Sequence, residues 1–253
     1  MTTIRDAYSI PSNVVAKDFI CGTELEIEAL STNVKHNYAN FNTTTDGSLR
    51  NNGCEFVSLP LCKKDSVFSF RNLHKLIKYG NGDPFTERTS IHVHVNCLDL
   101  DLDQAKSLVL WYSLFEPVFF GFCAKKRSNN IFCVPVEQTV LPNHYSKPFK
   151  AIVTKWSKYT AFNILPISTQ GTMEFRHMHG HNDVELYEEW LTALENWWKW
   201  GQENIPSKLT LKKESFIKDA FDAIFKDTRM HNIGTNVHTL VENNLIDLKL
   251  ALL

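Results

Sequence analysis

The chain has 253 residues, of which 43% are hydrophobic, and its 27 basic side chains nearly balance its 28 acidic ones. That length is enough for one large domain, or for a domain with an appendage. The near-zero net charge excludes a chain-wide attraction to nucleic acid or anionic membrane, but it does not exclude a local basic cleft. Residues 1–19 lack the basic and apolar regions of a secretory signal, and no apolar run is long enough to span a bilayer. We therefore expect a soluble, cytoplasmic protein whose six cysteines are reduced.

The first predicted strand carries an alternating acidic pattern. Residues 1–18 are polar and predict a loop, and a strand is expected over Phe19–Leu30. Successive strand residues point to opposite faces, so Glu24, Glu26 and Glu28 project together, opposite to apolar neighbours. Three like charges on one face repel one another, unless water solvates them or a cation lies between them.

Turn signals and hydrophobic periodicity predict the remaining elements. The first half is predicted to contain a loop over Ser31–Thr45, a turn at Asp46–Ser48, a strand over Gly53–Leu59, a helix over Asp65–Tyr79 and a strand over Ser90–Cys97. A helix from Asp103 to Phe122 with a kink at Pro117 follows, and then irregular chain over Arg127–Pro148. The rest is predicted to form a hairpin of Tyr159–Pro166 and Gly171–Met178, a helix over Val184–Trp200, and helices from Pro206 onward with a break near Gly234. This irregular alternation predicts an α+β fold with a mostly antiparallel sheet. We expect a catalytic domain over residues 1–204 and a helical appendage over residues 205–253, packed on the same domain.

Four predicted strands carry reactive side chains on the face opposite their apolar residues. These side chains are Glu24, Glu26 and Glu28 of one strand, Glu55 of another, His92 and His94 of a third, and Glu174 and Arg176 of a fourth. If the apolar faces pack on helices, the polar faces line one concave surface. Excess carboxylate oxygens without a C-x-x-C pair favour Mg²⁺ or Mn²⁺ over zinc. With Arg176 to bind an anion, this set predicts phosphoryl transfer, and the absence of a Walker A pattern argues against a P-loop.

These segments, in this order, resemble the amidoligase family of carboxylate–amine ligases. The matching segments are Gly22–Glu28, Asp46–Leu49 with Gly53–Ser58, Ser90–Asn96, and Gly171–Arg176. The resemblance covers about Phe19–Gly180 and leaves out the helical tail. It implies a catalytic fold like that of glutamine synthetase or glutamate–cysteine ligase: an antiparallel sheet curved into a half-open barrel around two or three divalent cations, with helices on its outer face.

The resemblance also implies roles for individual residues. The implied metal ligands are Glu24, Glu26, Glu28, Asp46, Glu55, His92 and Glu174. Arg176 is implied to hold the transferring phosphoryl group, Arg127 to face the carboxylate substrate or the phosphate, and Lys158 to contact the nucleotide. We expect His94 to support the site without ligating metal.

The implied reaction uses ATP with Mg²⁺ or Mn²⁺. A substrate carboxylate attacks the γ-phosphorus to give an acyl phosphate and ADP, and an amine then displaces phosphate to form an amide. The expected partners are a small-molecule or peptide carboxylate and an amine, which includes amino acids and peptides, and the sequence also allows a modified nucleobase as the carboxylate. We expect the loops over Ser31–Thr45 and Arg127–Pro148 to set that choice.

Two alternatives to the ligase stay open. In the first, the histidines of the predicted strands bind zinc or iron in a hydrolase or oxygenase; these are His92, His94, His177, His179 and His181. In the second, the chain is a catalytically silent relative that binds ATP, although each acidic position of the pattern still carries an acid. Glu174 and Arg176 also fit a simple ion pair.

Overall fold

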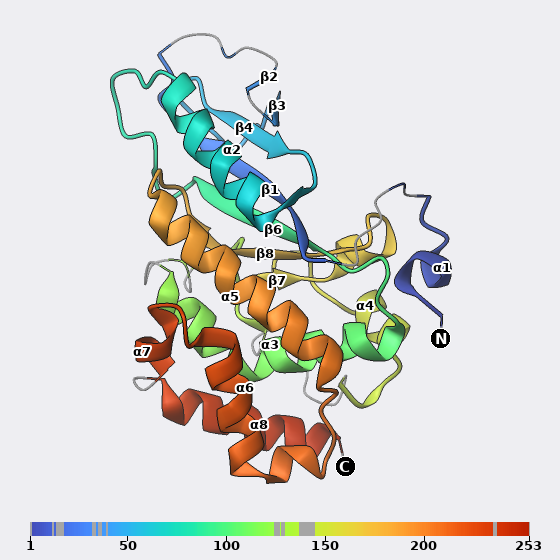
Figure 1. Ribbon diagram of the computed structural model, residues 1–253. Coiled ribbons are helices and arrows are strands. Elements are labelled where there is room, and N and C mark those ends of the chain that lie inside the picture. The colour runs from blue at the N-terminus through green and yellow to red at the C-terminus, as the bar shows by residue number, and fades with distance from the viewer. Residues whose placement is uncertain are drawn as a thin grey trace.

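The computed structural model describes residues 2–11, 13, 18–31, 34, 37–38, 40–123, 127, 130–136, 145–234 and 237–252. This part of the chain forms an α+β fold (Figure 1). The strands are β1 (Ile20–Ile27), β2 (Asn37–Tyr38), β3 (Phe41–Thr44), β4 (Cys54–Ser58), β5 (Leu61–Cys62), β6 (Ser90–Asn96), β7 (Phe162–Asn163) and β8 (Thr172–His179). The helices are α1 (Ile4–Tyr8), α2 (Lys63–Leu76), α3 (Leu102–Phe122), α4 (Phe149–Thr154), α5 (Val184–Glu203), α6 (Glu214–Phe225), α7 (Met230–Gly234) and α8 (His238–Ala251).

The described strands form one antiparallel sheet. Their order is β2-β3-β4-β1-β6-β8-β7, and β5 also pairs with β1. In this register Glu24 lies opposite His92 of β6, and Glu26 lies opposite Glu55 of β4. Directly opposite residues of antiparallel strands share a face. The pairing therefore gathers the polar side chains of neighbouring strands on one face, which we call the open face.

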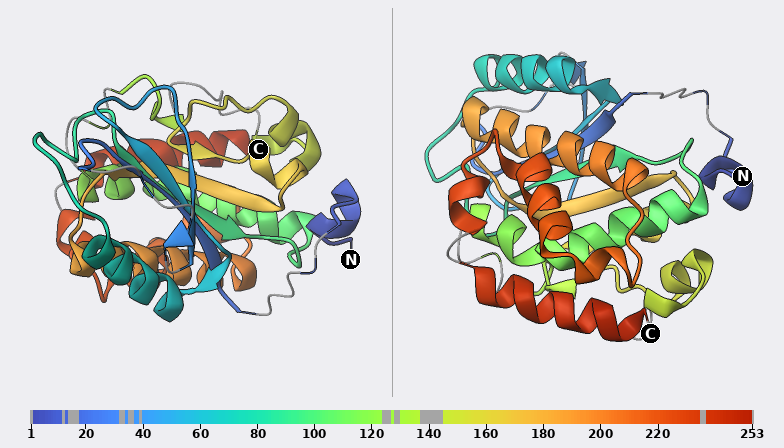
Figure 2. Two further views of the ribbon diagram at one scale, coloured as in Figure 1. Left: turned by 90° about the horizontal axis from the view of Figure 1, so that it is seen from above. Right: turned by 60° about the horizontal axis from the view of Figure 1, so that its bottom comes forward.

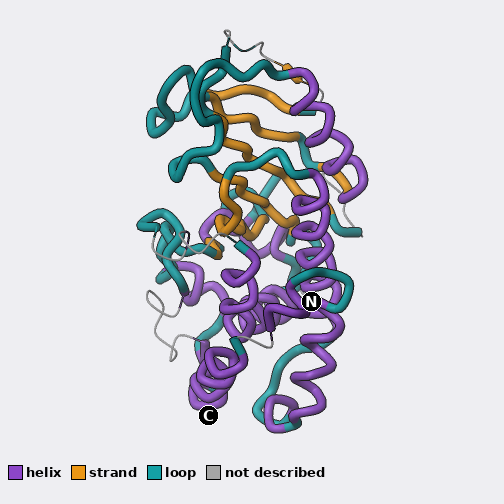
Figure 3. Tube along the Cα trace, turned by 90° about the vertical axis from the view of Figure 1, so that its left-hand side faces the viewer, coloured by secondary structure: helices purple, strands orange, loops and turns teal. Residues whose placement is uncertain are grey.

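Helices α2, α3 and α5 cover the other face of the sheet. In Figure 3, helices follow one side of the upper strands and mainly loops follow the other. Tyr112 of α3 stacks on Phe162 of β7 with 4.2 Å between ring centroids, and Tyr187 of α5 stacks on Phe70 of α2 at the same distance. The Tyr187 hydroxyl also lies 2.6 Å from Thr23 Oγ1 of β1, which joins the helix layer to the sheet. Such buried aromatic pairs dominate core energetics because each ring removes a large apolar area from water.

The helices after residue 204 form a further layer. Helix α6 packs on α5, and α7 and α8 pack on α3, on the side away from the sheet (Figure 2). Helix α1 lies at one edge of the molecule in both views of Figure 2, and Ile4 N donates to the Leu100 backbone oxygen at 2.8 Å. Within the described residues, no helix combines the length and apolar character needed to cross a membrane.

A bulge in β8 decides which of its side chains reach the open face. The register pairs Ile91 with Met178 but Val93 with Phe175, so β8 carries one extra residue between these pairs. As a result, His177 and Met178 are both fully buried under the helices, whereas Glu174 and Arg176 remain on the open face. Bulges of this kind redirect side chains and are common beside functional sites.

The structure confirms most predicted elements, and two expectations are wrong. Helix α1 lies in the predicted N-terminal loop, where the Thr3 hydroxyl accepts a hydrogen bond from Asp6 N and caps it. Strand β3 lies in the predicted loop Ser31–Thr45, because pairing with β4 orders a polar segment that has no hydrophobic period of its own. The proline at which a kink was expected, Pro117, does not interrupt the helix, because α3 is continuous from Leu102 to Phe122.

We expect His177 to make the stability of the fold depend on pH. Burial, with a smaller contribution from Arg127, lowers the pKa of its imidazole to about 3. An unfolded histidine titrates near 6.5, so the unfolded state binds more protons between these pKa values. Stability is therefore lost as the pH falls below about 6.5, by up to about 1.4 kcal/mol per pH unit.

The variant His177→Phe tests this expectation. Between about pH 7 and pH 5, the free energy of unfolding in urea should fall by up to about 2 kcal/mol less in the variant than in the natural protein. The matched control is His238→Gln, because His238 is exposed on α8. Equal pH dependence in His177→Phe and the natural protein would contradict the expectation.

Candidate metal centre

The open face holds two adjacent clusters of metal-ligating side chains. The histidine cluster consists of Glu24, His94 and Glu174, and the carboxylate cluster consists of Glu26, Asp46 and Glu55. Within each cluster, one ligand atom from each residue lies within 4.8 Å of the others. Glu24 and Glu26 are two residues apart on β1 and share its open face, so the clusters are neighbours.

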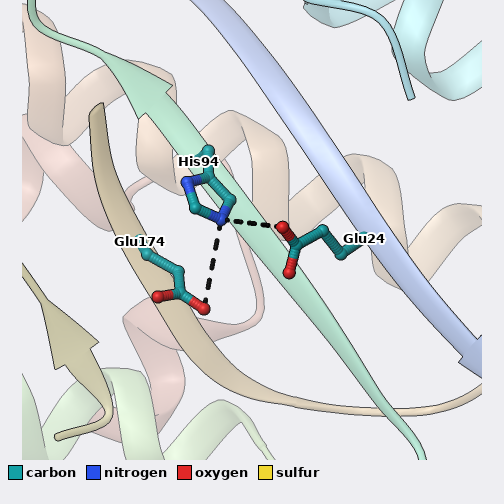
Figure 4. A group of neighbouring side chains, drawn as sticks. All are labelled: Glu24, His94 and Glu174. Atoms are coloured by element: carbon teal, nitrogen blue, oxygen red, sulfur yellow. Dashed lines mark ion pairs between the residues drawn. The ribbon is translucent and has the colours of Figure 1, made fainter. Parts of the chain in front are cut away.

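The histidine cluster directs one imidazole nitrogen at two carboxylates (Figure 4). His94 Nε2 lies 3.3 Å from Glu24 Oε1 and 4.0 Å from Glu174 Oε1. The other ring nitrogen, Nδ1, lies 3.0 Å from Thr172 Oγ1. His94 Nε2 is buried and makes no hydrogen bond within the described residues. One imidazole nitrogen with two carboxylate oxygens is a donor set that suits a divalent cation.

The same carboxylates lie beside His92. Its Nδ1 lies 3.2 Å from Glu24 Oε2 and 3.4 Å from Glu174 Oε1, and its Nε2 lies 2.8 Å from Ser90 Oγ. Ser90 donates its hydroxyl hydrogen to Glu26 Oε2 at 2.5 Å, so it can only accept from His92. Nδ1 of His92 therefore faces two carboxylates, and either a ring hydrogen or a divalent cation at that nitrogen offsets their negative charge.

Electrostatics in the histidine cluster favour an ionised Glu24. Burial raises the pKa of this carboxyl, but the neighbouring imidazoles of His92 and His94 outweigh burial and lower the pKa well below its usual range. Burial lowers the pKa of His94, and the carboxylates of Glu24 and Glu174 outweigh burial and raise it. The cluster therefore already balances part of its charge between carboxylate and imidazole.

The carboxylate cluster concentrates like charges without that balance. Burial and the charges of the neighbouring carboxylates raise the pKa of Glu55 to about 7. Among the described residues, no lysine or arginine forms an ion pair with Glu26, Asp46 or Glu55. Ser48 N donates to Asp46 Oδ1 at 2.7 Å and fixes that carboxylate. Three carboxylates without a counter-charge suit a hard cation such as Mg²⁺ or Mn²⁺.

Arg176 borders the histidine cluster. Its Nη1 contacts Glu174 Oε1, and its Nε donates to the backbone oxygen of Phe132 at 3.1 Å. The other oxygen of Glu174 accepts from Asn163 Nδ2 at 2.7 Å. Both side chains are therefore fixed beside the candidate metal position. A guanidinium held at this point suits an anionic group such as phosphate.

Arg127 lies beneath the site. Its Nη2 donates to the backbone oxygen of Arg176 at 2.6 Å, and its Nε donates to that of His177 at 3.3 Å. The side chain is 6% exposed. Its guanidinium thus binds two consecutive backbone carbonyls of β8 at the bulge, one of which belongs to Arg176.

We expect Arg127→Gln to destabilise the fold. Hydrogen bonds from a charged donor contribute about 1.5–3 kcal/mol each, and the shorter amide reaches at most one of the two carbonyls. The free energy of unfolding in urea should fall by about 1.5–3 kcal/mol. Arg71→Gln, at an exposed position of α2, is the matched control. Equal stability of the two variants would contradict this role.

Two other predicted site residues lie outside both clusters. Glu28 is buried, and it accepts from Arg50 N at 2.7 Å and from Thr86 Oγ1 at 2.9 Å. These bonds connect the end of β1 to the segments that carry Arg50 and Thr86. Lys158 places its Nζ 4.8 Å from the ring centroid of Tyr159, which is a cation–π contact.

The histidines near the end of β8 do not join a ligand cluster in the described part of the chain. His177 Nε2 lies 2.8 Å from the Tyr112 hydroxyl, in the helix layer. His181 Nδ1 accepts from Asp183 N at 3.1 Å, at the start of α5. A zinc site built on these histidines alone therefore finds no converging third ligand there.

Sequence reasoning assigned His94 a supporting role, whereas the structure places it in a ligand cluster with Glu24 and Glu174. Strand alternation put His92 and His94 on the same face and did not rank them. The register places each of them opposite a carboxylate, His94 opposite Glu174 and His92 opposite Glu24. The sequence also gave no sign that Ser90 and Asn163 would fix the carboxylates.

Comparison with known proteins adds no relationship. A scan against protein-family models found no match, and a search of the curated proteins also found none. We therefore infer function from the two clusters and Arg176.

Proposed function

We propose that this protein is an ATP-dependent carboxylate–amine ligase that uses Mg²⁺ or Mn²⁺. The observation that carries the proposal is the pair of adjacent ligand clusters on one sheet face, with the Arg176 guanidinium beside them. The proposal includes a glutamine-synthetase-like catalytic fold, in which the described sheet forms the wall of a half-open barrel and two or three metal ions lie on its open face.

The two clusters divide the metal ligands between them. Glu24, His94 and Glu174, with His92 beside them, would hold one ion, and the three carboxylates of the other cluster would hold a second. The His94 nitrogen that faces two carboxylates, and the three carboxylates of the other cluster, fit this assignment. Divalent ions bound there supply charge neutralisation for the phosphates of ATP and for the attacking carboxylate.

Arg176 binds the transferring phosphoryl group in this mechanism. Its contacts with Glu174 and with the Phe132 carbonyl pre-orient the guanidinium before substrate arrives. Preorganised donors stabilise developing charge without reorganisation during the reaction. Lys158, which lies outside both clusters, is assigned to the nucleotide.

The proposed reaction has two steps, phosphoryl transfer to the carboxylate and attack of the amine on the acyl phosphate. A carboxylate oxygen attacks the γ-phosphorus, the bond to the β,γ-bridging oxygen breaks, and ADP leaves with that electron pair. The amine nitrogen then attacks the acyl carbon, the carbon–oxygen bond to phosphate breaks, and the amine proton passes to solvent. Products are ADP, phosphate and an amide. The carboxylate belongs to a small molecule, a peptide or a modified nucleobase, and the amine to an amino acid, an amine or a peptide.

An ADP-release screen tests the proposal. Protein, ATP and Mg²⁺ are combined with pooled carboxylates and pooled amines, and the masses of the products are measured by mass spectrometry. We expect ADP release that requires both pools, and a product whose mass is the sum of two pool members less water. If ATP with Mg²⁺ neither binds nor shifts thermal unfolding, the proposal fails.

A zinc or iron enzyme is the second candidate, because His92 and His94 both lie beside Glu24. Two imidazoles and carboxylates around one position also suit these metals. Metal analysis of untagged protein separates the candidates. Tightly held zinc or iron whose removal abolishes activity supports this candidate, and exchangeable Mg²⁺ or Mn²⁺ supports the ligase. ATP binding without turnover supports a silent relative.

A further inference from the structure

A pocket of about 280 Å³ opens on the sheet beside the histidine cluster. It lies where β1 begins and β6 ends, and Glu24 and His94 form its border with the cluster. Its walls include the side chains of Ile20, Val57, Pro60 and Leu98. The pocket therefore combines apolar walls with one border made of candidate metal ligands.

The charges at this border are already matched. Glu24 has His92 Nδ1 at 3.2 Å from one oxygen and His94 Nε2 at 3.3 Å from the other. No lysine or arginine is present among the described residues that line the pocket. A carboxylate, phosphate or ammonium group would enter without an available counter-charge, and burying an unpaired charge is strongly unfavourable.

Two hydroxyl side chains in the lining are also engaged. Ser58 Oγ accepts from Thr23 N at 2.8 Å and donates to the Leu59 carbonyl at 2.9 Å. Thr172 Oγ1 lies 3.0 Å from His94 Nδ1. These hydroxyls hold the pocket in shape and have little capacity left for a ligand. The interior therefore favours an uncharged and mainly apolar group.

Gly22 gives this pocket its depth. It lies in the middle of β1, directly opposite His94, and lines the pocket. A Cβ added there would meet only His94 Cβ, at an ordinary contact distance of 3.9 Å. The backbone therefore does not require glycine, and a larger side chain would extend into the pocket. Glycine inside a strand often marks a close approach by a ligand.

We propose that this pocket binds an uncharged, mainly apolar group of one of the two co-substrates, and that Gly22 sets the size that fits. The proposal rests on the ligase function proposed above. It places the reacting end of that co-substrate toward Glu24 and His94, and the apolar end toward Val57 and Leu98.

Three probes with the same four-carbon chain test the charge preference: butyramide, butyrate and n-butylammonium. They are titrated into metal-free protein without ATP, and binding is followed by the NMR shift of the Gly22 amide. We expect butyramide to bind at least about tenfold more tightly than either ion. Tighter binding of butyrate or n-butylammonium, or no Gly22 shift with any probe, would overturn the proposal.

Two variants test the role of Gly22. Gly22→Val should weaken butyramide binding by at least about tenfold, and Gly22→Ala should weaken it less. Thermal unfolding checks that both variants are folded, and the shift of the Thr172 amide reports binding when residue 22 is changed. Butyramide binding to folded Gly22→Val at the natural affinity would overturn the proposal.

These tests separate the pocket from the ligase function, because the probes need neither ATP nor metal. Butyramide binding in a protein that fails the ADP-release screen would overturn the ligase function and leave the pocket standing. Turnover in a protein whose pocket binds none of the three probes would overturn the pocket proposal and leave the ligase function supported.

Discussion

Replacing Glu24 with glutamine is expected to abolish ATP turnover and leave the protein folded. The carboxylate of Glu24 lies within 3.3 Å of nitrogens of both His92 and His94, so it is the central anion of the histidine cluster. An amide of the same size removes that charge and one metal ligand. We expect the affinity for Mn²⁺ to fall by at least about 100-fold and ADP release by at least about 10³-fold.

Titration calorimetry with Mn²⁺ and steady-state ADP release provide the two measurements. The matched control is Glu189→Gln, because Glu189 pairs with Arg229 on the surface of α5. This control should keep both metal affinity and turnover. A folded Glu24→Gln variant with full activity would remove Glu24 from the site.

Arg176→Ala is expected to abolish turnover by a different route. In phosphoryl transfer, an arginine that stabilises the transition state contributes about 10³–10⁵ in kcat, and we expect a loss of that order. Mn²⁺ affinity should not fall, because the variant removes a positive charge that contacts the candidate ligand Glu174. Arg176→Lys should restore only part of the activity, since an ammonium cannot form the bidentate contact.

The same two measurements, made on each variant, separate the roles of Glu24 and Arg176. Arg71→Ala, at an exposed position of α2, controls for loss of a positive charge. If Arg176→Ala lost Mn²⁺ binding in step with turnover, Arg176 would serve only to hold Glu174. Full kcat in this variant would exclude Arg176 from the reaction altogether.

The shared face of the site was predictable from the sequence because strand side chains alternate with a period of two. That rule placed Glu24 and Glu26 together on β1, and it placed Glu174 and Arg176 together on β8. The irregular order of predicted strands and helices gave the antiparallel α+β class, which the structure confirms. Alternation is a local property, so a single strand is enough to reveal it.

Properties that depend on several segments were not predictable in the same way. The bulge in β8 and the pairing of His94 with Glu174 arise from strand register. Arg127 was expected to face the substrate or phosphate, but its guanidinium holds two carbonyls of β8. Its position in an irregular segment gave no face on which to place it. Buried carbonyls next to a bulge need hydrogen-bond donors, and the Arg127 guanidinium is the donor for these two.

The pocket beside the histidine cluster also has one feature that the sequence shows and others that only the fold shows. A glycine at position 22 is visible in the sequence, but only the pairing of β1 with β6 shows that it lies opposite His94 and lines a cavity. Its apolar walls come from segments far apart in the chain, among them Pro60 and Leu98.

Transfer of ¹⁸O from a labelled carboxylate tests the central claim most directly. The pooled carboxylates are labelled with ¹⁸O, combined with ATP, Mg²⁺ and amines in ordinary water, and the released phosphate is analysed by mass. An acyl-phosphate mechanism moves one carboxylate oxygen to phosphate, so we predict phosphate with one ¹⁸O for each amide formed. ATP consumption that yields only unlabelled phosphate would contradict the proposed ligase mechanism.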